Sequence, residues 1–232
     1  MLLTFKTKSS IFTALIISFF SLYSIPSSTV KYFDKSLSVK IFTLSKLNNK
    51  YSIIVNKKRR YNADDFKDFK YINITSTDGR NILIEEVTNI QFNKLKEEMK
   101  KQGINIGIKY ALRNEQEQSN LYKNFCEKYG KEYADKIVCP VGTSEHHTGL
   151  AIDVEVMAHN EWISNNDNIE ISEPILKVMH KYLIKYGFIL RYPKQKEDIT
   201  QITYEPWHIR YVGTELANYL NQNNLVLDEY LY

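Results

Sequence analysis

The most informative part of this sequence is the stretch Ser144-Glu145-His146-His147-Thr148-Gly149-Leu150-Ala151-Ile152-Asp153. It sets histidines, carboxylates and a glycine at the point where a polar segment turns into an apolar run. Closer to the end of the chain, Glu205-Pro206-Trp207-His208 adds another carboxylate and another imidazole. Because His, Asp and Glu are usual ligands of catalytic zinc, we expect the two clusters to meet around a metal ion.

Around these clusters, alternating apolar residues predict strands and apolar residues at helical spacing predict helices. The expected strands are 51–55, 72–74, 82–84, 104–108, 150–154, 188–192 and 204–212. The expected helices contain 92–99, 113–125, 174–186 and 216–220, with Pro174 at a first helical position, whereas 158–172 should be a loop. Strands and helices follow one another irregularly. We therefore predict an α+β domain with a mixed, mainly antiparallel sheet, flanking helices and the metal site on the sheet.

The first 28 residues differ from the rest of the chain. Lys6 and Lys8 precede an apolar run from Ile11 to Ile25. Fifteen helical residues extend about 22 Å, which is less than the ~30 Å hydrocarbon core of a bilayer. We expect residues 1–28 to be a signal peptide or an uncleaved membrane anchor, with a buried core helix as the remaining alternative. Residues 29–50 would then be a spacer and 51–232 the catalytic domain of an exported protein.

The amino-acid composition argues against a disordered protein and against a nucleic-acid-binding one. The chain has 17 Tyr and 11 Phe among 232 residues, which argues against disorder. A net charge of +4, spread along the sequence, does not indicate nucleic-acid binding but suits an anionic membrane or cell wall. Cys126 and Cys139 form no C-x-x-C pair. They could close a disulfide after export or remain two half-buried thiols, and we expect a monomer.

The candidate metal ligands must come from separate segments, because the helical H-E-x-x-H signature of many zinc peptidases is absent. If Gly149 lets the chain turn, His146 can project from a loop and Asp153 from the following strand. His208 would complete three ligands, and Glu205 would lie close enough to transfer protons. The alternative is that these are hydrogen-bonded structural residues. His159 and His180 are expected at the surface.

Two motifs identify a family resemblance. Residues 144–153 fit the S-x-H-x-x-G-x-A-x-D motif of zinc D-alanyl-D-alanine carboxypeptidases, and residues 205–208 fit their E-x-W-H motif. The longer run from Gly187 to Gly213 resembles the VanY-type branch, and the resemblance covers roughly residues 51–220. It implies the fold of Hedgehog-like D-Ala-D-Ala peptidases and one zinc ion per chain.

The resemblance also implies roles for individual residues. His146, Asp153 and His208 would be the zinc ligands, and Glu205 the general base and then the acid. Arg113 would hold the substrate and stabilise the developing oxyanion. The residues that match the family's remaining substrate contacts are Ser144 and Gln118.

The sequence departs from the family pattern in the walls of the substrate site. Tyr110-Ala111-Leu112-Arg113-Asn114 replaces the usual Ser-Gly-Tyr-Arg-Ser, while His147 and Gln201 stand where glutamine and glycine are common. The implied reaction is removal of the terminal D-alanine from a peptidoglycan stem peptide. The alternatives are an endopeptidase that cuts within the stem or cross-bridge, and a zinc-containing wall-binding module without turnover.

Overall fold

The computed structural model describes residues 49–163 and 168–230. The predicted leader 1–28 and nearly all of the spacer 29–50 lie outside the described residues, so both remain predictions. Within the described ranges, none of the helices is long and apolar enough to cross a membrane.

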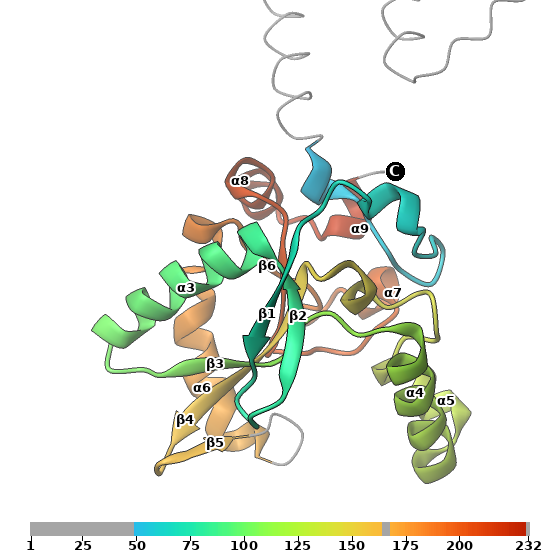
Figure 1. Cartoon of the computed structure of the whole chain (residues 1–232), viewed down its shortest axis with the longest axis horizontal. Coiled ribbons are helices and arrows are strands. Elements are labelled where there is room, and N and C mark those ends of the chain that lie inside the picture. Colours follow the sequence, from blue (N-terminus) through green and yellow to red (C-terminus); the bar gives the residue numbers. More distant parts are fainter. Residues whose placement is uncertain (1–48, 164–167, 231–232) are drawn as a thin grey trace, which may run out of the picture. The chain divides into compact units, whose positions relative to one another are not determined.

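A five-stranded antiparallel sheet carries the fold (Figure 1). Four of its strands are adjacent in the order β3-β4-β7-β6, and β5 pairs with the far part of β4. A separate antiparallel hairpin is formed by β1 and β2, close to the predicted strands 72–74 and 82–84, and its turn contains Gly79 with φ 85°. The strands are β1 Tyr71–Thr75, β2 Asn81–Glu85, β3 Ile106–Tyr110, β4 Ala151–Ala158, β5 Glu161–Ile163, β6 Phe188–Leu190 and β7 His208–Tyr211.

Helices surround the sheet, as the predicted α+β class requires. They are α3 Glu86–Lys101, α4 Glu115–Tyr129, α5 Lys131–Ile137, α6 Ile169–His180, α7 Glu197–Thr200, α8 Thr214–Gln222 and α9 Leu227–Tyr230. Short 3₁₀ turns are η1 Lys50–Ser52, η2 Ala63–Phe66, η3 Glu145–Thr148 and η4 Leu183–Tyr186. Local sequence explains the start of α4, where Asn114 and Glu117 form a reciprocal capping box.

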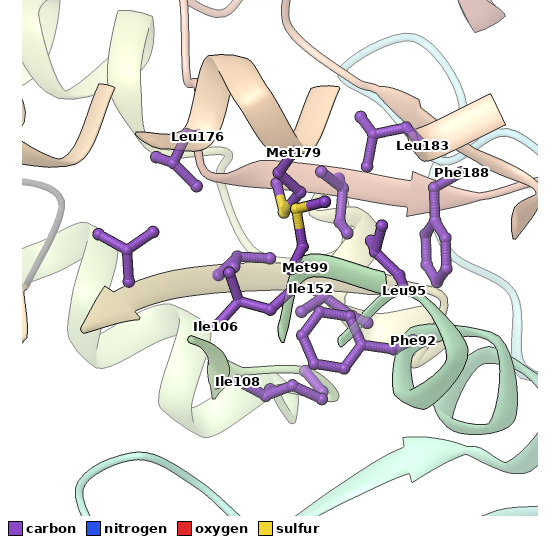
Figure 2. Packing of buried hydrophobic residues seen from close by; sticks show 14 of the residues in the cluster. Phe92, Leu95, Met99, Ile106, Ile108, Ile152, Leu176, Met179, Leu183 and Phe188 are labelled. Carbon is purple, nitrogen blue, oxygen red and sulfur yellow. The ribbon is translucent and has the colours of Figure 1, made fainter. Parts of the chain in front are cut away.

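The main core lies between one face of the sheet and helices α3 and α6. Along β4, Ile152, Val154 and Val156 are fully buried in this core, so the alternate residues of the strand face the other side. Met99 of α3 and Met179 of α6 project into the same cluster (Figure 2). The strand period therefore assigns Asp153 to the face opposite the core.

The structure corrects the predicted strand at 51–55. Residues 50–52 form η1 and the next three residues join no strand. The carbonyl oxygens of Tyr51 and Ile53 accept hydrogen bonds from Arg210, at 3.0 Å and 2.6 Å, instead of from a neighbouring strand. The side chain of Arg210 thus takes the place of the hydrogen bonds to a neighbouring strand that the prediction required.

Elements after residue 158 also differ from the prediction. The expected loop 158–172 contains β5 and the first turn of α6, so Pro174 is the sixth residue of that helix and not the first. A proline there removes one backbone N–H, which leaves the helix with one fewer internal hydrogen bond. The helix ends at His180 and a 3₁₀ turn, η4, continues to Gly187. Strands β6 and β7 are shorter than predicted.

Candidate metal centre and active site

The centre of the site lies where the neighbouring strands β3, β4 and β7 pair with one another. Asp153 of β4 pairs with His208 of β7 on one side and with Tyr110 of β3 on the other. A register shift between Ile108 and Tyr110 places Tyr110 opposite Asp153. Residues paired across neighbouring strands project on the same face, so these three side chains leave the sheet together.

His146 reaches the same place from the turn before β4. It lies in η3, which begins after Ser144 and ends at Gly149 in the left-handed conformation, with φ 69°. A side chain on Gly149 would approach Tyr71 within 2.7 Å, so the turn requires glycine for space as well as for backbone conformation. The ring is fixed by a 2.7 Å hydrogen bond from its Nδ1 to the carbonyl of Ala111.

His146, Asp153 and His208 form a group whose potential ligand atoms lie within 4.8 Å of one another. Nε2 of His146 is 3.2 Å from one carboxylate oxygen of Asp153, and Nδ1 of His208 is 3.2 Å from the other. Tetrahedral zinc with bonds of about 2.0–2.1 Å keeps its ligands about 3.3 Å apart. The two nitrogen–oxygen distances are close to that spacing, and the three ligand atoms as a set lie within the wider limit of 4.8 Å.

A second observation supports a metal at this point. Oδ1 of Asp153 is buried and, among the residues that the structure describes, accepts no hydrogen bond, although Nδ1 of His208 lies 3.2 Å away. Buried carboxylate oxygens without a partner are rare, because desolvation is costly. Two imidazoles and one carboxylate are also a known ligand set for catalytic zinc. The donor set and the orphaned oxygen therefore suit a bound cation.

Glu205 lies beside the group without belonging to it. Its Oε2 is 3.4 Å from Nδ1 of His208, and its side chain lines the same cavity as the three candidate ligands. Burial raises the pKa of the Glu205 carboxyl, and the negative charge of Asp153 adds to this effect, while His208 opposes it. A buried carboxyl with a raised pKa accepts a proton more readily than an exposed one, which suits a group that transfers protons.

The carboxylates also act on His208. Burial by itself lowers the pKa of this imidazole, but Asp153, Glu145 and Glu205 surround it and raise the pKa well above its usual value. His146 behaves differently, because burial lowers its pKa and outweighs the attraction of Asp153. The chain thus concentrates negative charge around His208, where a cation is expected to bind.

Arg113 lies beside Asp153, and several contacts fix the position of its guanidinium. Its NH2 lies 3.4 Å from Oδ2 of Asp153, its NH1 donates to Gln118 at 2.8 Å, and its guanidinium stacks 4.9 Å from the ring centre of Tyr110. Gln118 in turn donates to the carbonyl of Cys139 at 2.6 Å. The structure therefore places Gln118 behind Arg113, with both ends of its amide engaged by the protein.

The remaining candidates surround these groups. Ser144 is buried and lines the cavity, and its Oγ accepts from the backbone N–H of His146. His147 accepts from the N–H of Gly142 at 3.1 Å and contacts the carbonyl of Arg113 at 2.8 Å. Both of its ring nitrogens are occupied, so this histidine braces the backbone of Arg113 and lies outside the metal group.

The cavity has a volume of about 200 Å³ and two different walls. One wall, from α4, α5 and the segment that follows α5, is mostly apolar and includes Leu121, Phe125 and Cys139. Another part of the lining is polar and includes the ion pair between Lys109 and Glu155, at 3.2 Å. Neither Cys126, which is half-buried, nor Cys139, which is buried, forms a disulfide within the residues that the structure describes.

Sequence reasoning missed several residues near the site. His180 is half-buried and contacts the carbonyl of Pro206 at 2.7 Å, so it supports the loop before His208 and is not a surface residue. Glu145, Arg191, Arg210 and Asp228 are buried behind His208. Charged residues inside apolar strand segments, such as Arg191 and Arg210, were the available signal for this cluster.

Comparisons with known proteins agree with this geometry. The family model described as VanY: D-alanyl-D-alanine carboxypeptidase matches residues 81–214. A D-alanyl-D-alanine carboxypeptidase of Enterococcus faecium is 39% identical over 131 residues, which are 53% of this chain and 35% of that protein. The chain covers less than two thirds of the length of each of the four curated relatives it matches.

Solved structures have the same fold. A VanY D,D-pentapeptidase from a VanB-type resistance cassette, in complex with Zn(II), has a TM-score of 0.67 at 24% identity and covers 79% of this chain and 100% of its own. VanYB in complex with D-alanine-D-alanine has a TM-score of 0.66 at 26% identity, with 79% of this chain and 98% of that chain covered.

Proposed function

The chain belongs to the VanY D-alanyl-D-alanine carboxypeptidase family, and we propose that it is a zinc peptidase that hydrolyses the terminal D-alanine from peptidoglycan stem peptides. The observation that carries the proposal is the convergence of His146, Asp153 and His208 within 4.8 Å beside Glu205. A wall-binding module would need the metal group but would have no use for a buried proton-transfer residue.

His146, Asp153 and His208 would hold one zinc ion. Bound zinc lowers the pKa of a coordinated water to about 7 and polarises a carbonyl group. The chain's own contribution is to orient the three donors. The carbonyl of Ala111 holds the ring of His146, and the pairing of β4 with β7 sets Asp153 opposite His208.

Glu205 would move the proton. Its carboxylate faces the same point as Nδ1 of His208, and its burial raises its pKa. As general base it would accept a proton from water, and as general acid it would pass that proton to the amine of the departing D-alanine. Catalysis of this kind contributes about 10²–10⁴-fold to a rate.

Arg113 would stabilise the carbonyl oxygen as negative charge develops there. Gln118, Tyr110 and Asp153 restrain its guanidinium from three directions. A donor fixed before the reaction needs no reorganisation when the charge appears, which is the source of its catalytic effect. Ser144 would contact the substrate from the adjacent wall of the cavity.

We also propose that the protein acts outside the cytoplasm, because its substrate belongs to the cell wall. Residues 1–28 would serve as the export signal or membrane anchor, and 51–232 as the catalytic domain. The peptidoglycan stem peptide would be its partner, and the protein would act as a monomer.

The test is hydrolysis of defined muropeptides followed by mass spectrometry, with zinc content measured on the same protein. Loss of one terminal alanine supports the proposal. Internal cleavage would favour an endopeptidase, and bound zinc without any product would favour the binding module. Glu205→Gln should keep its zinc and lose about 10²–10⁴-fold in turnover.

The matched control for this variant is Glu155→Gln, which changes another buried carboxylate of the same cavity. Glu155 pairs with Lys109 and makes no contact with His208. It should keep its zinc and most of its turnover. Near-parental activity in Glu205→Gln would mean that another group is the base.

A further inference from the structure

Glu145 is a buried carboxylate for which the proposed reaction has no use. It follows Ser144 in η3, its side chain is inaccessible to solvent, and it does not line the cavity. Its Oε1 lies 3.1 Å from Nε2 of His208, on the side of the ring that faces away from Asp153 and Glu205. The role that these contacts indicate for Glu145 rests on the proposed zinc site.

Two arginines hold the other oxygen of Glu145. Oε2 accepts from Nε of Arg191 at 2.8 Å and from NH1 of Arg210 at 3.0 Å. Both arginine side chains are fully buried. We call Glu145, Arg191, Arg210 and Asp228 the arginine clamp. The two guanidinium groups stay charged at all ordinary pH values, so they hold this carboxylate by charge as well as by hydrogen bonds.

Further partners fix the clamp in place. Arg191 also pairs with Asp228, which accepts a 2.8 Å hydrogen bond from Asn56. Arg210 donates to the carbonyls of Tyr51 and Ile53. A buried ion pair is stable only when its remaining hydrogen-bonding groups also find partners. These contacts satisfy that condition, so the carboxylate of Glu145 has little freedom to move.

The sheet aligns the clamp with His208. The N–H of Arg191 donates to the carbonyl of His208 at 3.2 Å, and Arg210 is two residues further along β7. Side chains two apart in a strand share a face. The same strands that set His208 opposite Asp153 therefore also set the arginines beside Glu145.

The contact with Glu145 determines which nitrogen of the neutral His208 ring carries the proton. A neutral ring carries one N–H and one lone pair, and the partner of one nitrogen decides which state the other adopts. A histidine that binds a metal must be neutral, and in the neutral ring of His208 the carboxylate of Glu145 selects the tautomer that carries its proton on Nε2. Nδ1 then presents its lone pair to the point shared by Asp153 and Glu205, at 3.2 Å and 3.4 Å.

His146 shows the opposite arrangement. Its Nδ1 contacts the carbonyl of Ala111, so its Nε2 faces Asp153. One candidate ligand is thus oriented by a neutral carbonyl and the other by a carboxylate that two arginines hold. We infer that Glu145 is a positioning residue that fixes the ring of His208, so that Nδ1 faces the metal site, and makes that nitrogen a stronger ligand.

The test compares zinc affinities, measured by competition with a chromophoric chelator on the full chain. Glu145→Gln removes the charge and also leaves two arginines without it, so a double variant, Glu145→Gln with Arg210→Met, restores the charge balance. We expect zinc to bind 10–100-fold more weakly to the double variant, because partners that orient metal-bound histidines have effects of about that size. With cobalt in place of zinc, the visible spectrum should also change.

Glu145→Asp provides an independent variant that keeps the negative charge. A shorter side chain can still neutralise the arginines but is drawn back from Nε2 of His208. It should unfold at nearly the parental urea concentration and bind zinc more weakly. This separates the orientation of the ring from the stability of the clamp.

The matched control is Asp228→Asn, which changes a carboxylate of the clamp that contacts Arg191 and does not contact His208. It should lose stability and keep zinc affinity within about twofold. Equal zinc affinity in the parent, the double variant and Glu145→Asp would overturn the inference, as would an equal loss in Asp228→Asn. A parent chain that binds no zinc would instead overturn the proposed function and this inference with it.

Discussion

His208 stands between two buried charged clusters that differ in how completely their charges are paired. Behind the ring, in the arginine clamp, each carboxylate faces a guanidinium. In front of it lies the cavity cluster, which we define as His146, Asp153, Glu205 and Arg113. There, Asp153 and Glu205 both face Nδ1 of His208, and one oxygen of Asp153 has no hydrogen-bond partner in the described part of the chain.

The difference indicates what each cluster is for. Full pairing minimises the cost of burying charge and gives a rigid support. Incomplete pairing leaves an excess of acceptors at one point and costs stability, and natural proteins accept such a cost mainly at functional sites. The clamp is therefore expected to stabilise the chain, whereas the cavity cluster is expected to bind a cation.

The largest expected effect comes from removing the unpaired acceptor. Asp153→Asn replaces a candidate zinc ligand by a neutral group of the same shape. Zinc should bind at least about 100-fold more weakly, which exceeds the effect of losing a partner outside the ligand set. Zinc content after dialysis, measured by atomic spectroscopy, is the readout.

Glu155→Gln is again the control, since it lies two residues further along the same strand face. The comparison between the clusters is sharpened if Glu155→Gln keeps one zinc per chain and Asp153→Asn does not. Zinc retained by both variants would show that the cavity cluster is not the metal site.

The second prediction tests the clamp. Arg191→Met leaves Glu145 and Asp228 buried with fewer positive partners, and breaking a buried ion pair in this way costs about 3–5 kcal/mol. The free energy of unfolding should fall by that amount in urea titrations. Chelator must be present throughout, because a bound metal stabilises the folded state and would mask the change.

Lys177→Met is the matched control, because it removes a cation from a pair whose lysine is 58% exposed. Surface pairs contribute about 0–1 kcal/mol, so this variant should change little. If Arg191→Met is no more destabilising than Lys177→Met, the contrast between a supporting clamp and a strained site fails.

Much of the cavity cluster could be predicted from local sequence. The alternation of β4 separates Asp153 from the core residues Ile152 and Val154, and Gly149 marks the turn that carries His146. Periodicity also predicted α3 and α8 within their observed ranges. Each of these inferences depends on residues that are close together in the chain.

The arginine clamp could not be predicted from local sequence. Glu145 meets arginines 46 and 65 residues further along the chain, and Arg210 binds carbonyls more than 150 residues away. No periodicity records such contacts. The same long-range bonds explain why the predicted strand at 51–55 is wrong, since its carbonyls accept from Arg210 and not from a neighbouring strand.

The smallest effect is expected from a third kind of cluster, at the surface, where Glu173 accepts from Lys177, Lys194 and Tyr204. Its bonds to the two lysines lower the pKa of Glu173 from 4.5 to about 2. A carboxyl with a lowered pKa stabilises the fold above its unfolded pKa, and the contribution disappears as the pH falls from about 4.5 toward 2.

Glu173→Gln measures that contribution directly. The parent should be more stable than the variant by less than about 1 kcal/mol at pH 7, because solvent screens the pairs. The difference should shrink between pH 4.5 and pH 3 in urea titrations, whereas the loss in Arg191→Met should remain large at pH 7 and pH 4.5. A difference that does not change with pH would mean that Glu173 acts through packing. In that case, pairing of charge would not separate the surface cluster from the two buried ones.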